Sequence, residues 1–159
     1  MELAELAAPL RDFGSVDPLA AWRWLTGDDA APLLLTALGD LFVIRKSGEV
    51  AFLDVCQGTF NTVAPNVPAW ETSLTDQSRL AVWFNPDLVA ELKRRGLRPQ
   101  SGQCYSPILP PAVGGSMQPE NFECASWQLH PGLLGQTHEK SRRFPDGTPL
   151  RRFISESEE

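Results

Sequence analysis

The chain has 159 residues, 42% of them hydrophobic, and its 14 basic and 20 acidic side chains give a net charge of −6. This length suits one domain that buries roughly 70% of its unfolded surface, and is too short for two comfortable ones. No apolar run approaches the ~20 residues that cross a bilayer, and the acidic balance argues against binding nucleic acid through its phosphates. We expect a single soluble domain, residues 1–159, with neither membrane nor nucleic acid as a direct partner.

The termini and the cysteines bear on the compartment. The N-terminal segment, residues 1–16, carries Glu2 and Glu5 where a secretory signal would place basic residues. The three cysteines, Cys56, Cys104 and Cys124, form no C-x-x-C pair, which favours free thiols in a reducing compartment. We therefore expect a cytoplasmic protein. Residues 151–159 form an acidic tail, typical of a solvated terminus.

The first predicted elements are two short helices. Asp17-Pro18 is a helix start signal, apolar residues follow at helical spacing, and Gly27 ends the pattern. The spacing then predicts a second helix over residues 31–38, with Pro32 near its start and Gly39 just past its end.

A β-hairpin over residues 41–53 is the clearest element of the sequence. Two apolar runs flank a turn that contains Gly48. A turn at Gly58 and a third short strand over residues 59–63 extend the hairpin into a meander.

Helices follow in the middle of the chain. The apolar spacing from Trp70 to Phe84 favours helical turns, and Asn85-Pro86-Asp87 starts a further helix that ends in Lys93-Arg94-Arg95-Gly96. Cations in a last turn and a glycine at the C-cap are typical helix endings. The basic run therefore has a structural explanation, and it is too short for a nucleic-acid patch.

The C-terminal half adds strands over residues 103–105 and 121–129, which would enlarge the sheet, a helix over 130–140, and a turn over 144–149. The sequence thus predicts an α+β fold with a mainly antiparallel sheet of about four or five strands, the hairpin 41–53 at its centre, and helices packed on one face.

Residues 105–121, Y-S-P-I-L-P-P-A-V-G-G-S-M-Q-P-E-N, fit no regular element. Their prolines fix φ and remove main-chain donors, and Gly114-Gly115 opens conformations that other residues avoid. Ile108 and Leu109 are apolar enough to need burial. We expect a rigid packed loop whose role is structural.

The reactive side chains form no recognisable site. Cys–His catalysis with Cys104 or Cys124 needs a histidine within hydrogen-bond reach; His130 is better explained as a structural histidine and His138 as a solvated one. The two histidines are eight residues apart without a third metal ligand, and Gly114-Gly115 lacks the pattern of a phosphate-binding loop. We predict no catalytic residue, metal or cofactor.

Three stretches together resemble a known family: Gly39 to Gly58, G-D-L-F-V-I-R-K-S-G-E-V-A-F-L-D-V-C-Q-G; Gly102 to Gly115, G-Q-C-Y-S-P-I-L-P-P-A-V-G-G; and Pro119 to Asn121, P-E-N. They are similar to the C-terminal domain of the Tdi-type immunity proteins of type VI secretion systems, which often follows a GAD-like domain. The resemblance covers residues 17–150. Only about 16 residues precede it, so we expect a stand-alone version.

The resemblance implies an antitoxin for bacterial competition: a toxin inhibitor acting by protein–protein interaction on a cognate secreted effector, such as a nuclease. An acidic surface can cover a basic active-site face, and seven of the first 40 residues are acidic against two arginines. Candidate partner-binding residues are Asp12, Asp17, Asp28, Asp29 and Asp40. The shared motif positions would mark the fold, and they are Gly39, Asp40, Gly48, Asp54, Gly58, Tyr105, Pro110, Pro111, Gly114, Gly115 and Asn121.

Two alternatives remain open. One is a small enzyme or ligand-binding domain with a pocket near Cys104 and Tyr105. The other is a SUKH-like immunity or adaptor module, which shares the role and differs in fold details.

Overall fold

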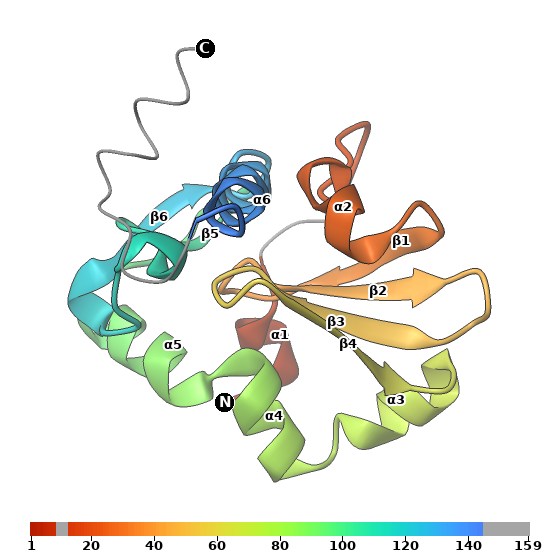
Figure 1. The fold of residues 1–159 in the computed structure, drawn as a ribbon. Helices are drawn as coiled ribbons and strands as arrows, with labels where there is room; N and C mark the ends of the chain where they lie inside the picture. The colour runs from red at the N-terminus through yellow and green to blue at the C-terminus, as the bar shows by residue number, and fades with distance from the viewer. Residues whose placement is uncertain (9–12, 145–159) are drawn as a thin grey trace.

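The structure is a computed structural model that describes residues 1–8 and 13–144, and its fold is α+β (Figure 1). The strands are β1 (Ala30–Leu35), β2 (Leu41–Arg45), β3 (Val50–Asp54), β4 (Thr59–Ala64), β5 (Gln103–Pro107) and β6 (Phe122–Ser126). The α-helices are α1 (Leu3–Leu6), α2 (Arg23–Thr26), α3 (Val67–Ser73), α4 (Gln77–Phe84), α5 (Pro86–Arg94) and α6 (His130–Ser141), and the 3-10 helices are η1 (Ala20–Trp22), η2 (Pro111–Val113) and η3 (Pro119–Asn121). The predicted acidic tail and all of the predicted turn after Phe144 lie outside the described residues.

The first sheet is an antiparallel meander with strand order β1-β2-β3-β4. The predicted hairpin is confirmed as β2 and β3 at its centre, with Leu41 opposite Leu53 and Ile44 opposite Val50. Gly48 takes a φ of +90° in the turn, where its N–H donates to the Arg45 carbonyl. The predicted third strand is confirmed as β4.

The predicted helix over residues 31–38 is wrong, because this segment forms β1. Ala31 pairs with Ile44, and Leu35 pairs with Leu41. Pro32 is tolerated because β1 is an edge strand, where a missing N–H need not cost a ladder hydrogen bond. Gly39, read as a helix C-cap, is instead part of the turn into β2, with a φ of +84°.

Alternating side chains of the meander face two separate cores. On one face, Phe42 packs against Phe52 at 4.8 Å, against Trp70 of α3 at 5.2 Å and against Trp83 of α4 at 5.4 Å between ring centroids. Figure 1 shows α3, α4 and α5 along this side, as the prediction of one helical face requires. The opposite face is covered as well, by η1 and α6, which pack Trp22 and Leu134 against Leu41. The sequence analysis does not anticipate this second layer.

Strands β5 and β6 do not enlarge the meander, so that prediction is wrong. They form a sheet of their own, in which Tyr105 pairs with Cys124. The two sheets meet at the β1–β2 turn, where the N–H of Tyr105, the central residue of β5, donates to the Ala37 carbonyl at 2.8 Å. The same turn is held by the Asp40 N–H, which donates to Thr36 Oγ1 at 3.1 Å.

Hydrogen bonds hold the proline-rich loop between β5 and β6. The Asn121 amide accepts from the Leu109 N–H at 3.0 Å and donates to the carbonyls of Leu109 and Ser116, both at 2.8 Å. Ile108 and Leu109 are 58% and 38% exposed, so the expectation that they need burial is wrong. The loop is ordered by its polar contacts instead.

We predict that Gly115→Ala damages this loop more than Gly114→Ala does. A Cβ at Gly115 would overlap the Leu109 carbonyl oxygen, so the backbone would have to move, at a cost of about 3 kcal/mol. Gly114 has a φ of +101° but open space around it, so alanine there costs only about 1–2 kcal/mol of backbone strain. Urea unfolding of both variants measures the difference, and a larger loss for Gly114→Ala would contradict this account.

Candidate functional site

The side chains of His130, Ser106 and Cys104 lie close together at the β1–β2 turn. They are the groups on which an enzyme site near Cys104 would depend. His130, the first residue of α6, places Nδ1 2.7 Å from Ser106 Oγ of β5. Its ring lies against Gly39: a Cβ at residue 39 would overlap His130 Nε2 and lie 3.3 Å from Cys104 Sγ. Residue 39 is therefore glycine for its space as well as for its positive φ.

Burial sets the protonation of this cluster. It lowers the pKa of His130 to about 4, with the Leu38 backbone opposing the shift. Burial also raises the pKa of the Cys104 thiol to about 12, and the nearby Asp40 carboxyl adds to the shift. At neutral pH the imidazole is thus uncharged and weakly basic, and the cysteine is a thiol. Neither is suited to nucleophilic catalysis, which requires a competent base or a thiolate.

The Ser106–His130 contact has the distance of a nucleophile–base pair but lacks the rest of such a site. A catalytic histidine is normally oriented through its second ring nitrogen, whereas His130 Nε2 has no hydrogen-bond partner among the described residues. The nearby Asp40 carboxylate instead accepts the Val55 N–H at 2.9 Å. His130 is therefore buried and hydrogen-bonded to Ser106, an environment that suits the structural role expected from the sequence.

His138 is not the solvated side chain that the sequence analysis expects. Its Nε2 lies 3.1 Å from the carbonyl oxygens of both Val55 and Cys56. A Cβ at Gly58 would come within 2.5 Å of its Nδ1. The histidine therefore fastens α6 to the turn between β3 and β4, and it gives Gly58, a predicted motif position, a steric reason to be glycine.

The candidate partner-binding residues divide into three groups. Asp28 and Asp29 are exposed in the turn before β1, and Asp17 is exposed at the start of the η1 segment. The prediction that Asp40 lies on the partner-binding surface is wrong. Asp40 is only 7% exposed, and burial raises the pKa of its carboxyl well above the usual range. Its role is to cap the Val55 N–H. Asp12 lies outside the described residues.

Arg23 brings the exposed aspartates into one region. Its guanidinium donates to Asp17 Oδ2 at 3.1 Å, to the Gly27 carbonyl at 3.1 Å and to the Ala30 carbonyl at 2.7 Å. These bonds tie the start of η1 to both ends of the turn that carries Asp28 and Asp29.

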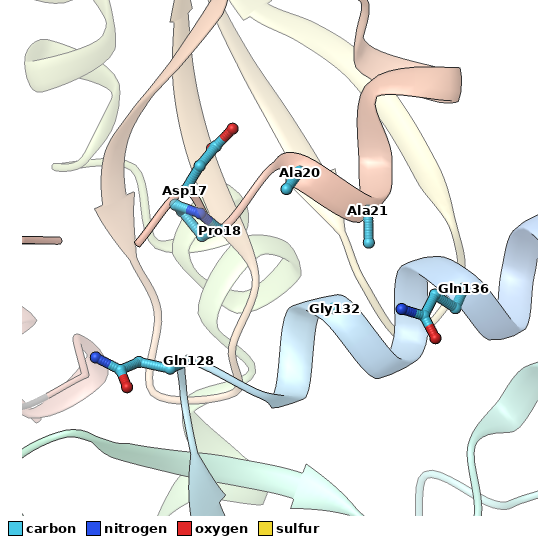
Figure 2. A pocket seen from close by; sticks show the side chains of 7 residues that line it. All are labelled: Asp17, Pro18, Ala20, Ala21, Gln128, Gly132 and Gln136. Atoms are coloured by element: carbon cyan, nitrogen blue, oxygen red, sulfur yellow. The ribbon is translucent and has the colours of Figure 1, made fainter. Parts of the chain in front are cut away.

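A hollow of about 390 Å³ lies between η1 and α6 (Figure 2). It is lined by Asp17, Pro18, Ala20, Ala21, Gln128, Gly132 and Gln136. A second hollow of about 310 Å³ shares Asp17 and Pro18 and reaches Ala30 and Ala31 of β1. Neither hollow includes Cys104 or Tyr105, where the alternative of an enzyme or ligand-binding domain places its pocket.

Two exposed leucines beside the first hollow escape the sequence analysis. Leu129, just before α6, and Leu133 within it are 65% and 62% exposed. They are four residues apart and so share a face of the helix. A single sequence shows only that α6 has apolar residues; which of them the fold buries depends on the packing of η1 and β5. The available signal is the spacing along the helix. Leu133 shares a face with Leu129, whereas Leu134 shares a face with His130.

The basic run at the end of α5 is engaged in ion pairs. Lys93 pairs with Glu5 at 3.2 Å, Arg94 with Glu91 at 2.6 Å, and Arg95 with Glu120 at 2.7 Å. Within residues 1–8 and 13–144, no group of three or more His, Cys, Asp or Glu side chains is placed to hold a metal ion. None of the helices in this part of the chain has the length and apolar character to cross a membrane.

Comparison with known proteins supports the resemblance. Residues 64–138, from the end of β4 to α6, match the family described as T6SS immunity protein Tdi1, C-terminal. The family predicted from the sequence is thus confirmed over this stretch. No curated protein matches the chain.

The fold is similar to the crystal structure of Atu4351 from Agrobacterium tumefaciens, with a TM-score of 0.50 and 15% sequence identity. The alignment covers 74% of this chain and 62% of that one, so the chain spans less than two thirds of its length. At this identity the likeness shows a shared fold alone.

We predict that acid weakens the fold through His130. In the unfolded chain the pKa of His130 is near 6.5, and in the folded chain it is about 4. Between these two pH values the unfolded chain therefore binds a proton at His130 that the folded chain does not bind. Stability is therefore lost as the pH falls through this window. Between pH 7 and pH 5, urea unfolding should show the wild type losing about 2 kcal/mol more than His130→Gln. The buried Asp40 titrates in the opposite sense but is present in both proteins, so equal losses would contradict the prediction.

Proposed function

We propose that this chain is an immunity protein that binds and neutralises a cognate toxin of a type VI secretion system. The observation that carries the proposal is the match of residues 64–138 to the T6SS immunity family. The matched stretch supplies α3, α4 and α5, the β5–β6 sheet and most of α6, and of the four-stranded meander it includes only Ala64. The toxin is thus neutralised by being bound, without chemistry in the immunity protein.

We further propose that the toxin presents a basic face, as a nuclease does. Asp28 and Asp29 are exposed, and neither makes an ion pair within the described part of the chain. Uncompensated carboxylates speed the encounter with a basic partner and disfavour acidic ones. Asp17 belongs to the same proposed contact region. Asp12, outside the described residues, remains a candidate from the sequence alone.

The cytoplasm is the compartment in which we place this inhibition. Cys56, Cys104 and Cys124 are all free thiols, and free buried thiols are typical of proteins kept in a reducing environment. There the immunity protein would meet a toxin delivered into the cell or made by it.

The alternative of a small enzyme gains little support. Cys104 is fully buried, and the Tyr105 hydroxyl donates to the Leu97 carbonyl at 3.0 Å. The Ser106–His130 pair remains its best candidate. If immunity depended on it, Ser106→Ala would abolish protection while leaving a toxin complex intact.

Our first prediction here is that the chain protects cells from the toxin encoded by the adjacent gene. Co-expression should restore growth, and the two proteins should co-purify as a stoichiometric complex. The proposal would be refuted if the gene lies among genes for metabolic enzymes and the chain forms no complex with the product of any adjacent gene.

Our second prediction is that charge reversal at the turn before β1 weakens the complex. Asp28→Lys with Asp29→Lys should lower the association rate by roughly tenfold at low salt, with a smaller difference at high salt, because screening removes long-range attraction. The matched control is Glu71→Lys, an exposed reversal on α3 at the other face of the sheet. Stopped-flow binding measures both. The control makes half the charge change, so a change in the logarithm of the association rate half as large would show that only net charge matters.

A further inference from the structure

The two hollows beside η1 form one continuous surface. They share Asp17 and Pro18, so the first opens toward α6 and the second toward the start of β1. Arg23 holds these parts together through its bonds to Asp17 and to the Ala30 carbonyl. The surface therefore runs from Gly132 and Gln136 of α6 to Ala30 and Ala31 of β1. The exposed Leu133 directly follows Gly132 in the chain, and Asp28 and Asp29 directly precede Ala30.

Small residues keep the first hollow open. Figure 2 shows Ala20 and Ala21 facing Gly132, with the amides of Gln128 and Gln136 on either side. The walls approach closely at Gly135, where a Cβ would lie 2.6 Å from the Ala21 carbonyl oxygen. At Gly132, in contrast, a Cβ would meet nothing within 4 Å. The depression thus has a fixed floor and room for a side chain from outside.

Apolar and acidic groups lie at opposite ends of this surface. Leu129 and Leu133 form an exposed apolar pair at the α6 end. At the other end, Asp28 and Asp29 lack ion pairs among the described residues. Arg23 is the one cation that lines either hollow in the described chain, and it makes three hydrogen bonds, to Asp17 and to two carbonyls. An occupant that complements this pattern has an apolar anchor and a basic flank.

We infer that this surface is the docking site for the toxin, and that the toxin segment seated on it carries an apolar side chain beside Leu133 and Lys or Arg side chains toward Asp28 and Asp29. The inference rests on the proposed function and deepens it by naming the contact. The apolar end supplies the buried anchor on which interface affinity usually depends, and the acidic end supplies orientation.

Leu133→Lys tests the anchor. It places a charge on an exposed position, so the fold should keep its stability, while the affinity for the toxin should fall by at least about tenfold through faster dissociation. The probe is the toxin encoded by the adjacent gene, recovered from the co-purified complex by denaturation and refolding. Val82→Lys is the matched control, because Val82 is 77% exposed on α4 at the other face of the sheet.

Gly132→Leu tests the hollow without adding charge. The new side chain enters open space, and leucine favours a helix more than glycine does, so stability should not fall. It should nevertheless block the first hollow and weaken binding by a similar factor. Ala90→Leu, an exposed apolar addition on α5, is its control.

The outcomes separate the two proposals. If the wild-type chain neither binds nor protects against the toxin, the proposed function fails. If the wild type binds and both Leu133→Lys and Gly132→Leu bind as tightly, the function stands and this docking site is wrong. The site is equally wrong if sedimentation shows that these variants change self-association of the chain and leave toxin affinity unaltered.

Discussion

The hydrogen bond from the Tyr105 N–H to the Ala37 carbonyl joins the two sheets, and the arrangement of the remaining parts depends on it. It ties the middle of β5 to the β1–β2 turn. β6 and α6 follow β5 in the chain, and α6 packs on the face of the meander opposite to α3 and α4. Asp40 and Thr36 shape this turn from within while almost fully buried. Buried polar groups without partners are costly, so their hydrogen bonds specify one geometry for the turn.

The motif positions acquire a common explanation from this junction. Gly39 makes room for His130, Gly58 makes room for His138, and both histidines belong to α6. Asn121 and Gly115 close the loop that returns the chain from β5 to β6. These residues fix where α6 lies relative to the meander. The surface proposed for the toxin therefore depends on residues that do not line it.

Local signals in the sequence predicted the elements whose partners are near in the chain. The hairpin around Gly48 and the helix after Asn85 have their turn and cap residues beside them. The helix predicted over residues 31–38 was wrong because Pro32 and Gly39 stand where helix start and stop signals are expected. The segment is a strand because it pairs with β2 at the edge of the sheet. The proposed site is harder still to predict, because the exposure of Leu133, the burial of Asp40 and the contacts of His138 are set by packing between distant segments.

The surface beside η1 is assembled from the two ends of the described chain. The Trp22 indole donates to the Pro131 carbonyl at 2.8 Å across a sequence separation of 109 residues. When only the residues up to the end of the meander have left the ribosome, the η1 side of the surface exists and the α6 side does not. Inhibition would thus begin only after α6 has been synthesised, so a chain truncated before α6 could fold in part and still leave its cell undefended.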